Sequence, residues 1–425
     1  MNDPSGLSRR RLLAGAGALL AGAGLAGCEN TTTPVATAEG SSGDGIMGDP
    51  TAGGPVDGSG IPLARRDYPV TLPKIGDPVK AGKPESGGEL QVYNYADYLN
   101  PEVIKAFGEQ ENVSVRVTTF NSLDEAFTKL STGRLKFDVI FTAPDHLSRL
   151  VGRRLIQPLN LDLVPNLKAE VWPELVNPFY DVGPRYTVPY TLYTTGIGWR
   201  NDKLGDFEPS ELGWESFWKS EPFRGHVGVL DDSREGIGLA LMRRGVVDLN
   251  TEDPELLKRA SDDLKQLNDI ARVKVTITGY ETLPAGRMWL NQVWSGDMLN
   301  AVISYLPEGT KPDVLSYWFQ QAGGPVFNDC ICVGAEAEKP VLAHRFMNFL
   351  LDPKNALENF VGYVGYQPPI TKIDADALFE QQVLPENLRN CVVTREDYAN
   401  GNAYLALTAD GRRLWDQNWD AFRNG

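Results

Sequence analysis

Predicted strands and helices alternate between residues 89 and 141, and this alternation restricts the fold more than any other feature of the chain. Residues 89–95 alternate polar and apolar side chains as a half-buried strand does, and 113–120 and 137–141 are also strand-like. The two intervening segments, 101–110 and 123–131, have the spacing of apolar residues that is typical of helices. Because parallel strands need a crossover that usually contains a helix, this order predicts an α/β fold with a parallel sheet covered by helices.

The same kind of pattern continues to the end of the chain. A long run of β-branched and aromatic residues at 186–199 is a candidate connection between two lobes. Further elements are predicted as strands at 226–230, 288–293 and 301–305 and as helices at 231–244, 254–271, 341–360 (broken at Asp352-Pro353) and 405–422. A folded body of about 340 residues is too long for one small α/β domain, so we expect two lobes. The first would contain residues 89–195 and about 325–370, and the second about 196–324 and 371–425.

The first 28 residues are typical of an export signal. Arg9, Arg10 and Arg11 precede an apolar run at 12–27, which is shorter than the roughly 20 residues that a bilayer-spanning helix needs. The run ends in Leu-Ala-Gly before Cys28, and this ending resembles a bacterial lipoprotein cleavage site. Residues 1–27 are therefore predicted to be a twin-arginine lipoprotein signal peptide, and Cys28 is predicted to carry the lipid. The alternative is a transmembrane anchor with an incidental cysteine.

Residues 28–88 are rich in Gly, Ser, Thr, Pro and Asp and mostly lack apolar periodicity. They are predicted to be a flexible tether between the lipid and the folded body. For the part around 68–73, an extended strand docked on the body is the alternative. A GxGxxG pattern at 22–27 predicts no dinucleotide site, because no strand precedes it and cleavage would remove it.

Composition and missing motifs exclude several classes of function. With 41 Lys and Arg against 56 Asp and Glu, the chain has a net charge of −15, which disfavours binding to nucleic acid. His146, His226 and His344 are far apart in the sequence, and no zinc-protease, nucleophile-elbow or P-loop motif is present. We therefore expect no catalytic residues, no metal and no cofactor.

The remaining cysteines leave one question open. Cys330 and Cys332 lie two residues apart on a predicted strand, so their side chains point to one face. This spacing is poor for a mutual disulfide and insufficient for a zinc site. One of the two would pair with Cys391 in an oxidising compartment, or all three remain buried free thiols.

Acidic and aromatic residues gather in five short clusters, most of them where a predicted strand meets a loop. The clusters lie at residues 94–98, 231–235, 294–297, 327–330 and 365–369. Ligands of α/β sheets bind at strand ends, so these clusters are candidates for one binding site. Each cluster also has a structural interpretation. Asp232 could cap a helix with Glu235 at its third position, the aromatic residues could belong to the core, and Asp329 could be a turn residue.

In this order, the clusters resemble those of the spermidine/putrescine-binding proteins of bacterial ABC importers, from about residue 90 to residue 425. The resemblance implies a two-lobe fold like that of type II periplasmic binding proteins, in which α/β lobes joined by crossovers close on the ligand like a hinge. It also implies a set of ligand-binding residues, which are Tyr95, Asp97, Tyr98, Asp232, Glu235, Trp294, Phe327, Asp329 and Tyr366. The chain departs from the family at 142–146, where Asp145 and His146 replace serine and tyrosine, so Asp145 joins the set. The late glutamine of some relatives has no counterpart, and Leu405 is the nearest residue.

The resemblance implies a substrate-binding lipoprotein that captures spermidine or putrescine and delivers it to a membrane permease. Carboxylates would hold the ammonium groups, and aromatic faces would cover the methylene chain. The implied partners are the polyamine and the permease subunits of an ABC importer. The protein would act as a monomer held by its lipid on the outer face of the cytoplasmic membrane. The alternative is the same fold with another small solute, such as a thiamine-like cation, amino compound, opine or sugar, which the loop at 142–146 favours.

Overall fold

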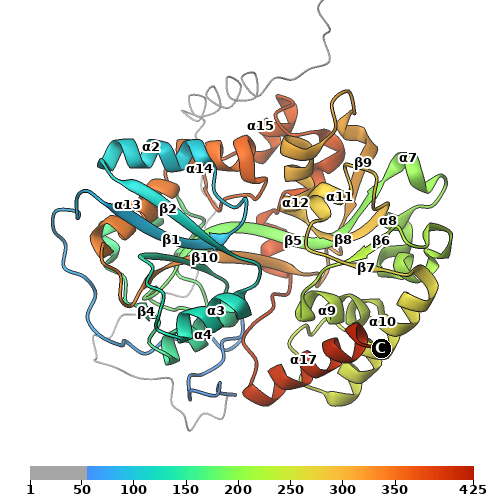
Figure 1. Cartoon of the computed structure of the whole chain (residues 1–425), viewed down its shortest axis with the longest axis horizontal. Helices are drawn as coiled ribbons and strands as arrows, with labels where there is room; N and C mark the ends of the chain where they lie inside the picture. Colours follow the sequence, from blue (N-terminus) through green and yellow to red (C-terminus); the bar gives the residue numbers. More distant parts are fainter. Residues whose placement is uncertain (1–54) are drawn as a thin grey trace, which may run out of the picture.

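The computed structural model describes residues 55–425, and one mixed sheet runs through both lobes of this part of the chain (Figure 1). Its ten strands are β1 (Glu89–Tyr95), β2 (Ser114–Phe120), β3 (Val139–Thr142), β4 (Ile156–Gln157), β5 (Val188–Arg200), β6 (Val227–Val229), β7 (Lys274–Val275), β8 (Leu290–Trp294), β9 (Leu315–Trp318) and β10 (Val326–Gly334). They lie in the order β2-β1-β3-β10-β5-β8-β6-β7, with β4 beside β10 and β9 beside β5. The predicted signal peptide and Cys28 lie outside the described residues.

Helices cover both faces of this sheet. The α-helices are α2 (Pro101–Glu111), α3 (Leu123–Ser131), α4 (Pro144–Gly152), α5 (Pro165–Glu170), α6 (Pro173–Val176), α7 (Asn201–Leu204), α8 (Pro209–Leu212), α9 (Ser233–Arg243), α10 (Pro254–Ala271), α11 (Gly279–Thr282), α12 (Ser295–Asn300), α13 (Pro340–Leu350), α14 (Pro353–Asn359), α15 (Ala375–Glu380), α16 (Arg395–Asn400) and α17 (Ala409–Arg423). In Figure 1, α2, α13 and α14 lie above the sheet, and α3, α4, α9, α10 and α17 lie below it.

A single long strand joins the two lobes. The first half of β5 pairs with β10, and its second half pairs with β8 and β9. The β-branched and aromatic run that was predicted to connect the lobes therefore forms one strand of 13 residues. The chain crosses again after α16, where the backbone of Val326 donates to the carbonyl of Asn402 (2.9 Å). The lobe boundaries given above stay a prediction.

The first lobe buries apolar side chains on both faces of β1, β2, β3 and β10. Alternation along β1 puts Leu90 and Val92 in the core under α2, α13 and α14. Tyr93 points to the other face, into a core that α3 and α4 cover. As the alternation of strands and helices predicts, β1 is parallel to both β2 and β3.

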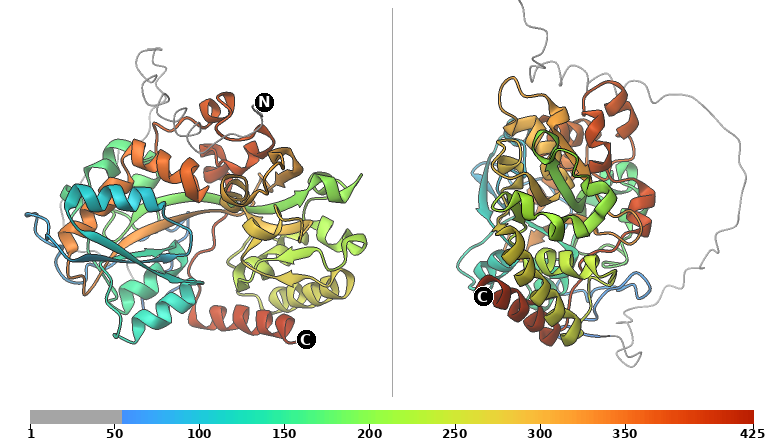
Figure 2. Two further views of the ribbon diagram at one scale, coloured as in Figure 1. Left: turned by 45° about the horizontal axis from the view of Figure 1, so that its top comes forward. Right: turned by 90° about the vertical axis from the view of Figure 1, so that its right-hand side faces the viewer.

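The second lobe has the same layered construction. The strands β6, β7 and β8 are parallel to one another. One face packs on α9, α10 and α17, where Trp415 is fully buried, and the other face packs on α11, α12 and α15. Figure 2 shows α17 running to the C-terminus beside α9 and α10.

Residues 55–75, which we call the strap, are packed on the first lobe. Ile61, Val70 and Leu72 are buried in the core beside α3 and α4. The backbone N–H of Val70 donates to Phe179 (2.8 Å), and that of Val182 donates to Val70 (2.9 Å). This stretch therefore differs from the flexible tether predicted for residues 28–88, because a few apolar side chains and an extended backbone find partners on the lobe.

Two predicted elements differ from the structure. The strand expected at 301–305 is wrong, since Ala301–Tyr305 is a π-helical continuation of α12. Its β-branched residues have strand propensity, but the segment follows a helix without a break. The C-terminal helix begins at Ala409 rather than at 405, because the side chain of Thr408 caps it by accepting from Gly411 N (2.9 Å). The three described cysteines are free and buried.

Candidate ligand-binding site

All ten residues predicted to bind the ligand line a single pocket between the lobes. The pocket encloses about 1380 Å³ of space, which includes solvent at its mouth. The predicted residues that line it are Tyr95, Asp97, Tyr98, Asp145, Asp232, Glu235, Trp294, Phe327, Asp329 and Tyr366. Their part in ligand binding stays a prediction, but residues distant in sequence and drawn from both lobes do converge on one slot.

Strand ends position several of these side chains. Tyr95 is the last residue of β1, Asp232 lies between β6 and α9, and Trp294 ends β8 and is the N-cap of α12. Asp329 lies in β10 and pairs with Thr191 of β5, and the register shifts directly after it, where Cys330 pairs with Pro189. Because Pro189 has no N–H to donate, the ladder is interrupted there, and a bulge of this kind re-aims the neighbouring side chain.

Asp329 is a buried carboxyl that hydroxyl groups surround. Tyr98 donates its hydroxyl to Oδ2 (2.8 Å), and Tyr193 donates to Oδ1 (3.2 Å). The residue is only 4% exposed. Burial raises the pKa of Asp329 to about 7, although the two tyrosines oppose the shift. A ligand cation beside this carboxyl would stabilise its charged form.

Glu235 is the counterpart of Asp329 in the second lobe. Its Oε1 accepts from the hydroxyl of Thr195 (2.8 Å) and from the indole N–H of Trp294 (2.7 Å). Its Oε2 accepts a longer bond from Tyr404 (3.4 Å). Burial, followed by the nearby charge of Asp232, raises the pKa of Glu235 to about 8.

Asp232 is both the N-cap of α9 and part of the pocket wall. Its Oδ1 accepts from the backbone N–H groups of Arg234 (2.8 Å) and Glu235 (3.1 Å). The expected cap is therefore present, but the Glu235 side chain turns into the pocket instead of back to the cap, so no capping box forms. Burial raises the pKa of Asp232.

Asp297 lines the same pocket and was not among the predicted residues. It lies in α12, is 4% exposed, and accepts at Oδ1 from the hydroxyl of Tyr366 (2.7 Å). Burial raises the pKa of Asp297 to about 7. The signal that could have found it is its place three residues after Trp294, on the first turn of a helix that follows a strand end.

Asp145 is paired with a cation of the protein itself, unlike Asp329 and Glu235. Its Oδ1 lies 2.9 Å from Nδ1 of His146, whose Nε2 lies 3.3 Å from Asp124 Oδ1. Burial alone would lower the pKa of His146, but Asp145 and Asp124 outweigh it and raise the pKa to about 9. The additional carboxylate expected in this loop is thus present, with an imidazolium beside it. Arg149 also pairs with Asp124 (2.6 Å).

Asp97 lies at the rim of the pocket with tyrosines of two segments around it. It has a φ of 54°, a left-handed conformation that aspartate adopts more readily than most residues. Its carboxylate accepts from Tyr363 (2.9 Å) and from Tyr305 (3.1 Å), which lies in the π-helical segment after α12. The carboxylate therefore joins segments that are far apart in the sequence.

Aromatic rings form the wall between these carboxyl groups. Phe327 and Tyr404 stack with centroids 4.8 Å apart, and Tyr193 lies 5.4 Å from Phe327. Tyr366 is 5.4 Å from Tyr193 and 4.9 Å from Tyr98. Tyr193 and Tyr404 were not predicted as site residues. Tyr404 directly precedes Leu405, the residue nearest to the position of the family glutamine. Ala403 and Tyr404 line the pocket, whereas Leu405 does not.

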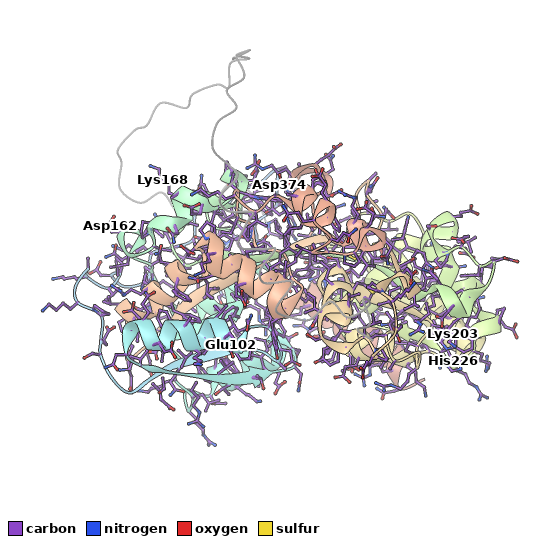
Figure 3. The ribbon with its side chains drawn as sticks, turned by 90° about the horizontal axis from the view of Figure 1, so that it is seen from above. Glu102, Asp162, Lys168, Lys203, His226 and Asp374 are labelled. Atoms are coloured by element: carbon purple, nitrogen blue, oxygen red, sulfur yellow. The ribbon has the colours of Figure 1, made fainter. Side chains whose placement is uncertain are left out.

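His226 and His344 do not line the pocket. Residues 55–425 contain no cluster of three or more His, Cys, Asp or Glu side chains that could hold a metal ion. His226 lies at the outer end of the second lobe, the same end as Lys203 (Figure 3), and its ring stacks on Trp289 (4.0 Å). His344 is buried and accepts from the backbone of Asn160 (3.0 Å). None of the helices within 55–425 is long and apolar enough to span a bilayer.

The arrangement is suited to holding an elongated cation. Buried carboxyl groups on both lobes supply hydrogen-bond acceptors, and tyrosine, tryptophan and phenylalanine rings supply apolar area and cation–π attraction. Arg234 and His146 are the cationic side chains among the residues that line the pocket. Eight Asp and Glu side chains line the same pocket, so its wall is strongly acidic.

Comparison with known proteins agrees with this geometry. A model of the bacterial extracellular solute-binding protein family matches residues 102–387, which is more than half of the chain. The chain belongs to this family. The predicted binding, non-enzymatic role of this solute-binding protein is thereby confirmed.

Curated relatives and solved structures are similar over most of this solute-binding protein. Spermidine/putrescine-binding periplasmic protein 1 of Haemophilus influenzae is 26% identical over 297 residues, which are 69% of this chain and 78% of that protein. The putrescine/agmatine-binding protein of Pseudomonas aeruginosa is 28% identical over 288 residues, which are 65% and 77% of the two chains. A spermidine/putrescine ABC transporter substrate-binding protein from Streptococcus pneumoniae has a TM-score of 0.63 at 22% identity, covering 80% of this chain and 99% of its own. The predicted fold class is confirmed by this similarity.

Proposed function

We propose that this solute-binding protein captures a polyamine, such as spermidine or putrescine, for an ABC importer. The observation that carries the proposal is the burial of Asp329, Glu235 and Asp297 in one pocket, where the hydrogen bonds they accept come from neutral side chains. Such carboxyl groups are stabilised in their charged form by a cation from outside the protein. The names of the two curated relatives, which mention spermidine, putrescine and agmatine, support the same class of ligand.

The proposed binding mode puts amines towards opposite ends of the pocket. Asp329 holds one ammonium group, and Glu235 with Asp232 holds another. Asp97 assists at one end or at an inner amine, and the aromatic wall covers the methylene groups. Each charge-assisted hydrogen bond contributes about 1.5–3 kcal/mol in a partly dry cleft. Relief of repulsion among the carboxylates would favour the closed arrangement of the lobes.

Delivery to a permease completes the proposed role. We infer from the sequence that the twin-arginine signal exports the chain and that Cys28 carries a lipid after cleavage. The protein would then stay on the outer face of the cytoplasmic membrane as a monomer and pass its ligand to the permease subunits. Replacement of Cys28 by Ser should release the protein from the membrane fraction, and retention there would argue against the lipid.

Calorimetric titration with putrescine and spermidine tests the proposed ligand. We expect both Asp329→Asn and Glu235→Gln to weaken binding about 10-fold to 100-fold, because each removes a charge partner of an ammonium group. Asp206→Asn, an exposed acidic residue outside the pocket, is the matched control and should bind like the parent. Parent-like affinity of both pocket variants would mean that the proposed site is wrong.

A second candidate is a solute that carries a carboxylate as well as a cation, such as an opine. The observation that favours it is the pair of cationic side chains, His146 and Arg234, in the pocket wall. A thermal-shift screen with polyamines, thiamine, opines and sugars separates the two candidates. A ligand at 100 times its dissociation constant should add about 2.7 kcal/mol of stability. Stabilisation by an opine and not by amines would remove the first proposal.

A further inference from the structure

Two acceptor atoms on α12 are buried in the pocket wall without a partner. Asp297 and Asn300 both line the pocket and are 4% and 5% exposed. Neither Oδ2 of Asp297 nor Oδ1 of Asn300 has a hydrogen-bond partner among the described residues. They lie three residues apart on one helix, so both side chains are on the same face.

An unpaired buried acceptor is unfavourable, and a ligand removes this cost by supplying hydrogen-bond donors, such as the N–H groups of an amine. Tyr366 already donates to Oδ1 of Asp297, which leaves Oδ2 open. The two oxygen atoms differ in the ligand property that determines their interaction energy. The carboxylate of Asp297 attracts the positive charge of a ligand and also accepts hydrogen bonds from it. The neutral amide of Asn300 interacts with a ligand mainly by accepting hydrogen bonds.

Aromatic rings next to these acceptors do not distinguish one ammonium from another. The ring of Tyr366 packs directly against the start of α12, where a Cβ on Gly296 would come within 2.3 Å of it. Tyr98 lies 4.9 Å from Tyr366. Rings of this kind attract methylated ammonium groups as well as primary ones. Discrimination between a primary and a methylated ammonium therefore needs a residue whose interaction depends on the N–H groups of the ligand.

We propose that Asn300 is a specificity-determining residue that selects a primary ammonium, with three N–H donors, against a fully methylated one. This inference rests on the proposed function, because it assumes a cationic ligand in the pocket. The ammonium that Asp329 holds would lie at this end of the pocket, because Tyr98 donates to Asp329 and packs on Tyr366, which donates to Asp297. Its three N–H groups would then supply Asp329, Asp297 and Asn300 with one hydrogen bond each. A trimethylammonium group brings the same charge but leaves the oxygens of Asp297 and Asn300 unpaired in a dry site.

The test compares putrescine with hexamethylputrescine, in which both nitrogens are fully methylated. Calorimetric titration of the parent protein should show a clear preference for putrescine. In Asn300→Leu, which has similar volume and no acceptor, putrescine affinity should fall about 10-fold while hexamethylputrescine affinity changes little. Asn300→Ala repeats the test if the larger apolar side chain disturbs folding, which circular dichroism checks. Asn300→Asp keeps an acceptor and should retain the preference.

The outcomes separate the two proposals. If the parent binds putrescine and Asn300→Leu keeps the parent ratio of the two affinities, or weakens both ligands equally, the role of Asn300 is overturned and polyamine binding stands. If the parent binds neither amine, the proposed function fails. The inference is supported if the affinity for putrescine relative to that for hexamethylputrescine falls in both Asn300→Leu and Asn300→Ala.

Discussion

The ionisation of Glu235 is set mainly by its burial and by Asp232, against which a few neutral hydrogen-bond donors act. The indole of Trp294 and the hydroxyl of Thr195 donate to its carboxylate and favour the charged form, while burial and Asp232 oppose it more strongly. With the pKa raised to about 8, the empty site holds a proton on Glu235 over most of the neutral range. An ammonium group that enters the site would displace this proton.

Polyamine affinity should therefore rise with pH and level off near the pKa of Glu235. We expect putrescine to bind more tightly at about pH 8 than at about pH 6, because the ligand amines, with a pKa of about 10, stay charged in this range. Trp294→Phe removes one donor that favours the charged form, so the levelling-off should move to higher pH. Calorimetry over a pH series measures both effects.

A matched control for this substitution is Trp289→Phe. The indole of Trp289 donates to the carbonyl of Gly286 (3.1 Å) and does not line the pocket. Its replacement should leave the pH profile unchanged. A flat profile in the parent protein would contradict the role of Glu235 in binding.

At the scale of single elements, α9 begins with a residue that has two separable tasks. Asp232 caps the helix through its Oδ1 and also contributes charge to the pocket. Asp232→Ser keeps a cap and removes the charge, whereas Asp232→Ala removes both. We expect the alanine variant to be about 1 kcal/mol less stable than the serine variant in urea unfolding, while both lose polyamine affinity to a similar extent. Equal stability of the two variants would show that the cap contributes nothing.

The regular elements could be predicted because their signals are local. The helix predicted at 254–271 coincides with α10, where Asp253 caps the first turn and apolar residues repeat along one face. The strand ends that hold the predicted clusters were likewise visible as a change of pattern. Clustered acids and aromatics at those ends, together with the family resemblance, were enough to name ten residues that the structure brings into one pocket.

The parts that sequence reasoning missed depend on contacts across the fold. Tyr193 lies in the middle of β5, where polar and apolar residues do not alternate regularly and nearly every residue is buried, so the pattern does not show which side chain faces the pocket. Tyr404 lies outside any helix or strand, where no periodicity exists. The pairing of His146 with Asp124 joins residues 22 positions apart on neighbouring helices. Only the packed structure reveals such partners.

At the scale of the whole molecule, the empty pocket makes stability depend on pH. Glu235, Asp297 and Asp329 have higher pKa values in the folded protein, at about 8, 7 and 7, than carboxyl groups have when unfolded. His146 is also raised, to about 9. In each case the folded state binds more protons over the interval between the two values, so stability falls as pH rises through it.

The free energy of unfolding of the ligand-free protein should therefore decrease from about pH 5 to about pH 9. Glu235→Gln should flatten the part between about pH 4.5 and pH 8, and His146→Gln the part between about pH 6.5 and pH 9. Urea denaturation at several pH values measures the slope. An increase of stability with pH over this range would contradict the raised pKa values.

The strap connects the first lobe to a segment, Leu405-Ala406, that is bound to the second lobe. The guanidinium of Arg65 donates to the carbonyl of Ala406 (3.1 Å). The second lobe fixes the adjacent residue, since Asn250 accepts from the backbone of Leu405 (2.7 Å). Arg66, the next residue, donates instead to the carbonyl of Tyr398 (2.6 Å), whose ring packs in the core of the first lobe. Arg65 thus makes a contact towards the second lobe, whereas the contacts of Arg66, which include stacking on Phe179 and Tyr398, stay within the first.

Separation of the lobes would break the contact of Arg65 and leave that of Arg66 in place. We therefore expect Arg65→Ala to favour the open arrangement and to weaken polyamine binding about threefold, although no pocket residue is altered, because a net hydrogen bond contributes about 1 kcal/mol. Arg66→Ala loses a hydrogen bond to a backbone carbonyl as well, together with cation–π contacts inside the first lobe, and should bind like the parent. Small-angle scattering of the ligand-free variants should show a larger radius of gyration for Arg65→Ala alone. Equal polyamine affinities and equal radii of gyration for the two variants would mean that the strap packs on the first lobe without restraining the lobes relative to each other.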